Sequence, residues 1–499
     1  MNETMYETGK ETNDSKVVIG ENNRKPQKGM GILFVFGALV IFAGGLLLGY
    51  LANSIDTAKK TKGKAEEQVV QEALEEGITA EDAAREVTLF VEQSEPLVTA
   101  SESFTPRVGV MRTEEYYEYP DDFSISDEEY RTIFGKVSYV TATNKNIAVI
   151  TENGDLYMWG KSDWGQIGGS GEDVNTPVKI LSDVVSVDFS EGHAAAITQK
   201  GDLYLWGNNM AGQVGNGRSL EIQATPVKVL TKVKKVSLGN TFSGALCENG
   251  ELYTWGGSQQ NGFGTDIFKP VKIAEDVADF EMNARNGGYV TTDGVLYMWG
   301  FNGWGTAGAG TTQTNIYTPV KIMDGIKSIH ISECTTAAIA VNGDLYMWGE
   351  NYCGQLGAGV ENEEVYAPVK VLSNVKSVAL FGFHTAAVTY SGNLYMWGQN
   401  TNGQLGVVPT RLKKNNYYTP VVICENVENV ALGNRHTAAI MKNGDLYMWG
   451  INAHQQISDD GTWKYDTPVK IAENMASVAI GWECTYLVDK EGNFYYLGE

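Results

Sequence analysis

The stretch Gly154-Asp155-Leu156-Tyr157-Met158-Trp159-Gly160 decides the fold, because close copies of it recur to the end of the chain. The copies begin at Gly201, Gly250, Gly294, Gly343, Gly392, Gly444 and Gly492, and in the last one a leucine replaces the tryptophan. Successive first glycines are 47, 49, 44, 49, 49, 52 and 48 residues apart. A period of this length with several short strands in each unit indicates a propeller or a similar array.

Each unit holds further strand patterns around this element. Examples are a valine-rich run from Val184, a small apolar run from Ala194 and a Thr-Pro-Val-Lys-Ile run from Thr176. Alternation and β-branched residues predict strands, and the glycine before each Leu-Tyr element predicts a hairpin turn. A unit is therefore a four-stranded antiparallel sheet, which buries both faces only when copies are arranged radially. We expect the repeated tryptophans to pack between blades; they are Trp159, Trp206, Trp255, Trp299, Trp348, Trp397 and Trp449.

The number of strands favours eight blades. The chain supplies eight small apolar runs, eight Leu-Tyr elements and seven Thr-Pro runs. The repeats start near Val137-Ser138-Tyr139-Val140 and end just after Leu497, so we expect this first run to complete the last unit. The two chain ends would then share one blade and leave no open sheet edge.

At this level of detail the repeats resemble the regulator of chromosome condensation repeat family. The resemblance rests on the Leu-Tyr-x-Trp-Gly strands, the Thr-Pro strands, and the turns Asn351-Tyr352-Cys353-Gly354-Gln355-Leu356-Gly357 and Asn400-Thr401-Asn402-Gly403-Gln404-Leu405-Gly406. Similar turns occur at residues 165–168 and 212–215, and the resemblance covers about residues 137–499. It implies an all-β propeller, usually with seven blades, so seven is the alternative to the eight that the strand count gives.

The resemblance also implies that the propeller acts by binding other proteins. Members of the family bind small GTPases and promote nucleotide exchange, and a secreted member inhibits β-lactamases. Together these features predict a non-enzymatic protein-interaction module without a cofactor, and they leave the partner's identity open.

The sequence predicts a membrane span before the repeats. Residues 31–52, GILFVFGALVIFAGGLLLGYLA, are almost wholly apolar and long enough to cross a bilayer as a helix. Basic residues balance on the two sides, but three of the leading ones lie within six residues of the span, which favours a cytoplasmic tail and an extracytoplasmic propeller. We expect an uncleaved signal anchor, although Ala52-Asn53-Ser54 leaves cleavage open. Gly45 and Gly49 form a Gly-x-x-x-Gly spacing, which is a weak indication that two such helices associate.

These segments divide the chain into four parts. They are a basic and polar tail (1–29), a transmembrane helix (30–52), an acidic linker with a short helix (53–136) and the repeat domain (137–499). Residues 66–130 hold 19 acidic and three basic side chains, which accounts for most of the net charge of -23. That charge argues against a nucleic-acid partner.

The residues that carry chemistry show no repeated reaction centre. His193, His384 and His436 share one repeat position, where the other units have Asn146, Phe242, Asn286, Thr335 and Cys484. No single metal site or triad uses such a mixture, so we interpret these side chains as structural. The acids before the Leu-Tyr strands fit hairpin turns. The five scattered cysteines include no Cys-x-x-Cys pair, which argues against a zinc site or a disulfide scaffold.

Two alternative functions stay open. One is a hydrolase with a site at the central channel, and the other is carbohydrate binding through aromatic rings outside the repeat pattern. The rings are those of Trp164, Trp304, Trp463 and Trp482.

The candidate partner contacts come from the segment that departs furthest from the compared repeats. Residues 407–418, VVPTRLKKNNYY, are basic in an acidic chain and lengthen the loop after a Gly-Gln-Leu-Gly turn. Arginine and tyrosine often dominate binding energies at interfaces. The candidates are Arg411, Lys413, Lys414, Tyr417 and Tyr418, and the alternative is a solvated insertion without a role.

Overall fold

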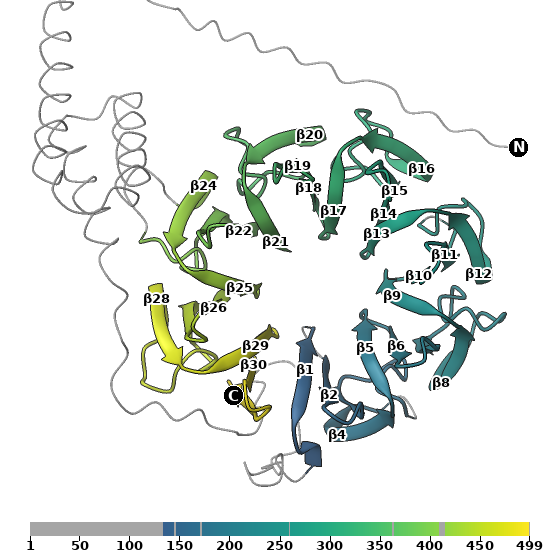
Figure 1. Cartoon of the computed structure of the whole chain (residues 1–499), viewed down its shortest axis with the longest axis horizontal. Helices are drawn as coiled ribbons and strands as arrows, with labels where there is room; N and C mark the ends of the chain where they lie inside the picture. Colours follow the sequence, from purple (N-terminus) through teal and green to yellow (C-terminus); the bar gives the residue numbers. More distant parts are fainter. Residues whose placement is uncertain are drawn as a thin grey trace, which may run out of the picture. The chain divides into compact units, whose positions relative to one another are not determined.

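The computed structural model describes residues 133–143, 146–169, 172–258, 260–361, 364–408 and 415–498. In these residues, 31 strands form eight antiparallel sheets arranged as blades around an axis (Figure 1). The described residues therefore form an all-β propeller with eight blades, as the strand count predicts, rather than the seven usual for the resembled family. The predicted membrane span and acidic linker lie outside the described residues.

Each complete blade contains four consecutive strands, ordered from the axis outwards (Figure 1). The inner strands are β1 (Val137–Ala142), β5 (Val184–Phe189), β9 (Val233–Leu238), β13 (Val277–Met282), β17 (Ile326–Ile331), β21 (Val375–Phe381), β25 (Val427–Leu432) and β29 (Met475–Ile480). The second strands are β2 (Asn146–Thr151), β6 (His193–Thr198), β10 (Phe242–Cys247), β14 (Asn286–Thr291), β18 (Thr335–Ala340), β22 (His384–Thr389), β26 (His436–Met441) and β30 (Thr485–Asp489).

The Leu-Tyr elements form the third strands. They are β3 (Leu156–Gly160), β7 (Leu203–Asn208), β11 (Leu252–Gly256), β15 (Leu296–Phe301), β19 (Leu345–Gly349), β23 (Leu394–Gln399), β27 (Leu446–Ile451) and β31 (Phe494–Leu497). The Thr-Pro runs form the outer strands β4 (Val174–Leu181), β8 (Ile222–Leu230), β12 (Ile267–Ala274), β16 (Asn315–Met323), β20 (Val365–Leu372), β24 (Asn416–Cys424) and β28 (Lys464–Ala472).

The predicted sharing of one blade by the two chain ends is wrong. Strand β1 pairs with β2 in the first blade, with Tyr139 opposite Ile150, and the last blade contains only β29, β30 and β31 among the described strands. The reason is positional: Val137 precedes its second strand by the same nine residues as Val184, so it fills the inner position of its own blade. The last and first blades instead join by packing and by the Val137 N–H, which donates to the Gly492 carbonyl at 2.8 Å.

Apolar side chains fill the spaces between neighbouring blades. The second strands are the most buried, because both of their faces pack against neighbouring blades. Between the last and first blades, the Phe134 ring stacks on Trp159 and meets Phe494 edge to face, with ring centroids 5.8 and 5.4 Å apart. This aromatic cluster closes the ring of blades by packing the last blade against the first.

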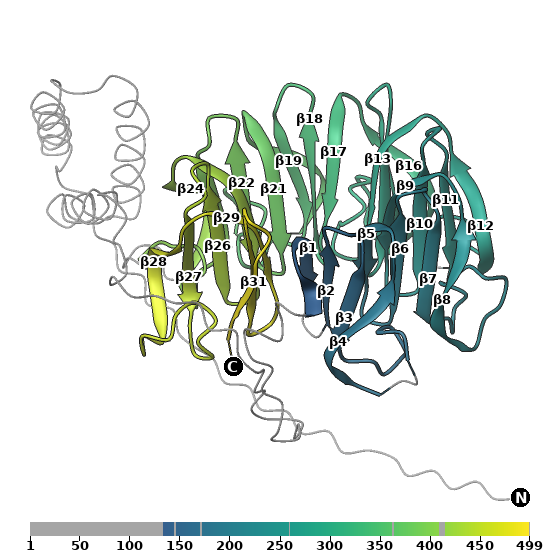
Figure 2. The same cartoon turned by 60° about the horizontal axis from the view of Figure 1, so that its bottom comes forward.

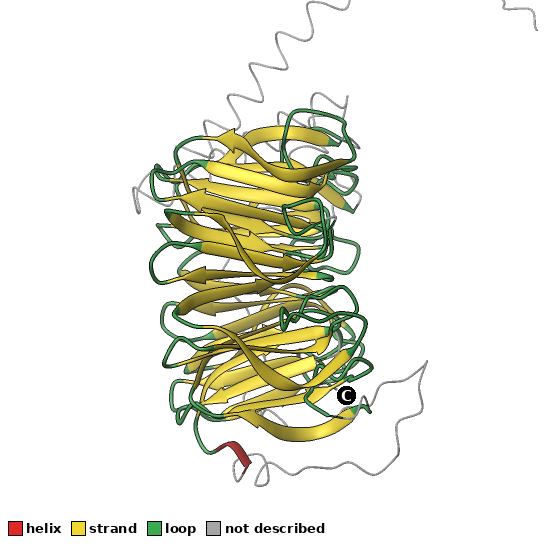
Figure 3. Cartoon of the chain, turned by 90° about the vertical axis from the view of Figure 1, so that its right-hand side faces the viewer, coloured by secondary structure: helices red, strands yellow, loops and turns green. Residues whose placement is uncertain are grey.

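The antiparallel order gives the propeller two different faces. At one end of each blade lie the turn between the inner and second strands and the long loop between the third and outer strands; we call this end the loop face (Figures 2 and 3). At the other end lie the hairpins between the second and third strands and the short connections to the next blade; we call this the turn face. The described chain enters β1 from the turn face.

Candidate functional site

The repeated tryptophans join the blades, as predicted. Six of the seven are fully buried and Trp159 is nearly so. Each of the six donates its indole N–H to a backbone carbonyl in the loop of the preceding blade, and examples are Trp206 to Gln166 at 2.8 Å and Trp397 to Gln355 at 2.9 Å. The bonds fix each long loop to the next blade, so the base of the loop face is rigid.

The three histidines at the shared repeat position are structural. All three are buried, and burial lowers the pKa of His193 and His436 to about 3 and that of His384 to about 4. The His193 ring lies 2.9 Å from the Ser243 hydroxyl and the His436 ring 3.0 Å from the Thr485 hydroxyl, each in the next blade. His193 and His436 are therefore neutral groups that join neighbouring blades, whereas the Nε2 of His384 has no hydrogen-bond partner among the described residues. No group of His, Cys, Asp or Glu suited to a metal ion is found in the described parts of the chain.

The repeated acids on the turn face form ion pairs with lysines of their own blade. Five outer-strand lysines lie within 3.1 Å of the acid that begins the third strand. The pairs are Lys179–Asp155, Lys228–Asp202, Lys272–Glu251, Lys370–Asp344 and Lys470–Asp445. This explains the recurring lysine of the Thr-Pro strands.

Charged side chains of the inner strands form contacts between neighbouring blades. Lys235 on β9 lies 2.7 Å from Asp279 on β13, and the Leu238 N–H donates to Asp188 of the preceding blade at 2.9 Å. Burial raises the pKa of Asp188 to about 6 and that of Glu281 to about 7, against the hydrogen bonds that each accepts from a backbone N–H. These carboxylates accept hydrogen bonds from backbone N–H groups of a neighbouring inner strand, so they stabilise the contact between adjacent blades.

The loop face collects the residue types that most often dominate interfaces. The four tryptophans outside the repeat pattern lie in its turns or loops; they are Trp164, Trp304, Trp463 and Trp482. The three described arginines lie there as well: Arg218, Arg285 and Arg435. Exposed Tyr352 and Phe383 add two further rings. Tryptophan, tyrosine and arginine are enriched at binding hot spots.

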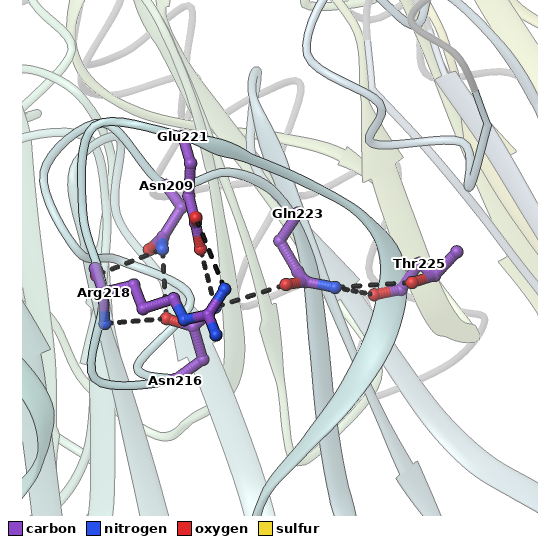
Figure 4. A network of polar contacts seen from close by, with 6 residues as sticks. All are labelled: Asn209, Asn216, Arg218, Glu221, Gln223 and Thr225. Carbon is purple, nitrogen blue, oxygen red and sulfur yellow. Dashed lines mark hydrogen bonds and ion pairs between the residues drawn. The ribbon is translucent and has the colours of Figure 1, made fainter.

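Polar networks hold individual loops of this face in shape. In the second blade, Asn216 accepts hydrogen bonds from the Asn209 side chain at 3.1 Å and from the Arg218 N–H at 3.0 Å (Figure 4). Its own amide donates to Glu221 and Gln223, each at 3.2 Å. The loop therefore presents the exposed Leu220, whose φ is +59°, on a fixed backbone. Such strain in a bulky residue is typical of functional sites.

The candidate contacts from the 407–418 loop are placed only in part. Arg411, Lys413 and Lys414 lie outside the described residues. The Tyr417 side chain is 2% exposed and packs in the core between the sixth and seventh blades, so it is not presented to a partner. Tyr418 is half-buried and lies against Gly354 of the neighbouring loop.

One position at the rim of the channel was missed by reasoning from the sequence. The residue before each second strand differs between blades, and its carbonyl accepts a backbone N–H at the end of the third strand. The bond is present in six blades, where the residue is Gly192, Thr241, Arg285, Cys334, Phe383 or Arg435. The sequence signal that could have identified this position is its variation within an otherwise strict repeat, directly before the histidine position.

Comparisons with known proteins agree with this architecture. A family model described as RCC1-like domain matches residues 109–423, and one described as regulator of chromosome condensation (RCC1) repeat matches residues 427–456. No curated protein matches the sequence.

Solved structures share the fold at low sequence identity. A structure of Kap60 bound to yeast RCC1 (Prp20) matches with a TM-score of 0.53 and 19% identity over 78% of this chain and 96% of that chain. Human WBSCR16 matches with a TM-score of 0.53 and 19% identity over 67% and 100%. Prp20p from Saccharomyces cerevisiae, described with its binding properties to Gsp1p and histones, matches with a TM-score of 0.52 and 20% identity over 75% and 94%.

Proposed function

The chain belongs to the RCC1-like domain family, and on that premise we propose that it is a membrane-anchored protein-interaction module whose partner docks on the loop face. The observation that carries the proposal is the segregation of side chains between the two faces. The tryptophans outside the repeat and the described arginines lie on the loop face, whereas the turn face carries lysine–acid pairs within single blades. Exposed ion pairs of that kind contribute little binding energy.

The rigidity of the loop face supports a binding role. The indole N–H bonds of Trp397 and its equivalents tie each loop to the next blade, and the network around Asn216 fixes one loop internally. A surface that is already ordered loses less conformational entropy on association. Proteins named with the RCC1 structures, namely Kap60, Gsp1p and histones, indicate that this fold accommodates protein partners.

The anchor and the orientation are part of the same proposal. Residues 31–52 would span the membrane and place the propeller outside the cytoplasm. Within the described residues, no helix has the length and apolarity needed for a membrane span. The first described strand, β1, begins at the turn face, at the opposite end of the blade from the loop face. A role without catalysis fits the use of the buried histidines as joints between blades.

Site-specific photo-crosslinking in cells tests the docking face. The photoreactive residue benzoylphenylalanine replaces Tyr352 on the loop face in one full-length variant and Tyr390 on the turn face in the control. The two tyrosines are matched, at 46% and 53% exposure. We expect a discrete crosslinked protein from position 352 and none from position 390. Equal capture from both positions, or capture from 390 alone, contradicts the proposal.

A further inference from the structure

An exposed apolar patch lies on the loop face of the second and third blades. It consists of Met210, Leu220, Ile222 and Phe268, which are 44%, 76%, 48% and 38% exposed, and we call it the Leu220 patch. The Leu220 N–H donates to the Met210 carbonyl at 3.4 Å. Ile222 begins β8 two residues later, and the Phe268 ring of β12 lies against Gly212 in the same loop. Single exposed apolar residues are common, but several gathered on one loop indicate an interaction site.

The backbone of Leu220 makes its exposure unusual. Eight described residues other than glycine have a positive φ, and Leu220, at +59°, is the only apolar one among them. The others are Asp183, Lys232, Asp276, Asn374, Asn426, Gln455 and Asn474. Asparagine and aspartate tolerate the left-handed region, whereas a bulky apolar side chain is strained there. Leu220 is therefore unfavourable in the free propeller both by its backbone and by its contact with water.

The repeat does not require an apolar residue at this position. Leu220 stands five residues before the threonine of its Thr-Pro strand. The equivalent residues of the other six blades with such a strand are polar or glycine, namely Gly171, Gly264, Gln313, Asn362, Lys414 and Thr462. The same fold is thus built six times without an apolar side chain here, so the leucine serves something other than the blade.

Hydrogen bonds hold the loop that carries Leu220 on both sides. The Asn209 side chain donates to the Arg218 carbonyl at 3.1 Å within the loop (Figure 4). The Gly217 N–H donates to the Phe268 carbonyl at 2.8 Å, which joins the loop to the third blade. Leu220 is therefore presented on a fixed backbone, and binding to it costs little conformational entropy.

Two cations flank the patch and define the chemistry of its partner. Lys269 follows Phe268, is exposed and forms no ion pair within the described residues, and its side chain crosses Gly217 of the Leu220 loop. The Arg218 side chain is 74% exposed, and its ion pair with Glu221 is long, at 3.9 Å. An apolar surface between cations complements an apolar side chain that stands next to carboxylates.

We propose that the Leu220 patch anchors an acidic segment of the partner protein that carries an apolar or aromatic side chain, an inference that rests on the proposed function. The apolar side chain packs on Leu220 and Phe268, and the carboxylates beside it meet Lys269 and Arg218. Binding removes the leucine side chain from water, so the unfavourable exposure of Leu220 in the free protein is relieved in the complex.

Fluorescence anisotropy with the full-length protein in lipid nanodiscs tests the chemistry of the partner. The probe is a fluorescein-labelled copolymer of glutamate and tyrosine. Labelled polyglutamate keeps the charge without the rings, and a lysine–tyrosine copolymer keeps the rings and reverses the charge. We expect the glutamate–tyrosine copolymer to bind at least tenfold more tightly than either. Equal binding of polyglutamate, or tighter binding of the lysine–tyrosine copolymer, overturns the proposal.

A matched pair of variants locates the binding on the Leu220 patch. Leu220→Asn introduces the residue type that the fifth blade has at this position, and we expect it to weaken binding of the glutamate–tyrosine copolymer at least fivefold. Its melting temperature should rise by about 1–3 °C, because asparagine tolerates the left-handed backbone. Val341→Asn on the turn face, where Val341 is 70% exposed, should change binding less than twofold. A lower melting temperature for Leu220→Asn, or equal losses of binding in the two variants, overturns the proposal.

Lys269→Thr tests the contribution of the cation, because threonine occupies this position in five other blades. We expect severalfold weaker binding of the same probe, and unchanged affinity would contradict the acidic partner. Self-association in sedimentation that Leu220→Asn abolishes would assign the patch to a second copy of the chain and overturn the proposal. Failure of the proposed function is separate: crosslinking from position 352 that persists in the Leu220→Asn variant retains the docking face and removes the anchor alone.

Discussion

Two glycines in one loop offer a test of how tightly the tryptophans lock the blades. Gly308 and Gly310 in the fourth blade have φ values of +67° and +66°, and each N–H donates to a backbone carbonyl. A Cβ at Gly308 would lie 2.5 Å from the Trp348 indole nitrogen, whereas a Cβ at Gly310 would meet no atom within 4 Å. Alanine at either position therefore meets the same backbone strain, and only Gly308→Ala meets the indole.

The expected magnitudes separate the two variants. An alanine in the left-handed region costs about 1–2 kcal/mol, so Gly310→Ala loses roughly that amount of unfolding free energy. Overpacking of a closed core adds about 1–3 kcal/mol, because Trp348 is fully buried and its N–H is bonded to the Thr306 carbonyl at 3.0 Å. For a domain of this size the added loss corresponds to a melting temperature about 1–4 °C lower in Gly308→Ala than in Gly310→Ala.

Thermal melts of the two variants and of each combined with Trp348→Phe measure this difference. In the Trp348→Phe background, we expect the difference between the two alanines to shrink, because the atom that the Cβ meets is gone. Equal melting temperatures for Gly308→Ala and Gly310→Ala would refute the close approach of indole and glycine. A difference that the phenylalanine background leaves unchanged would assign the cost to another contact.

Four further results are expected. Trp397→Phe should lower the free energy of unfolding by about 1–3 kcal/mol, because it removes the indole hydrogen bond and leaves a small cavity. Trp159→Phe should lower it less in the same denaturation assay, because Trp159 makes no such bond within the described residues. Equal losses would contradict this. Burial raises the folded-state pKa of Glu281 to about 7. The contribution of its protonated form to folding stability is therefore fully present below pH 4.5 and is lost as the pH rises through 7. Melts from pH 5 to 8 should therefore fall more in the wild type than in Glu281→Gln, and parallel curves would contradict the shift. Protease added to intact cells should remove the propeller, and survival of the propeller until permeabilisation would reverse the proposed orientation. Arg411→Ala with Tyr418→Ala should weaken partner capture by ~2 kcal/mol without changing the melt, and unchanged capture would remove that loop from the interface.

The sequence predicted those parts of the molecule that repeat. The Leu-Tyr-x-Trp-Gly elements predicted the third strands, the burial of their tryptophans and the number of blades, because each copy supports the same assignment independently. The phase of the repeat was harder to assign. The run at Val137 has the pattern of an inner strand, and only the pairing of Tyr139 with Ile150 shows that its partner is the next strand along the chain.

The unusual side chains of the loop face could not be predicted in the same way, because they depart from the repeat and come together from separate loops. Arg285 precedes β14 and Trp304 follows β15, and the fold brings their side chains together within one blade. Tyr417 shows the opposite error. It lies in a basic loop that departs from the repeat, yet it pairs with Gly398 as part of β24 and its ring is buried.

Hydrogen–deuterium exchange of the full-length protein with and without its crosslinked partner tests the central claim most directly. The account predicts slower exchange in the loop-face segments, such as residues 301–315, 332–335 and 349–361, with no change in the turn-face hairpins around Asp155 and Asp445. Protection confined to the turn-face hairpins or to the outer strands would contradict docking on the loop face.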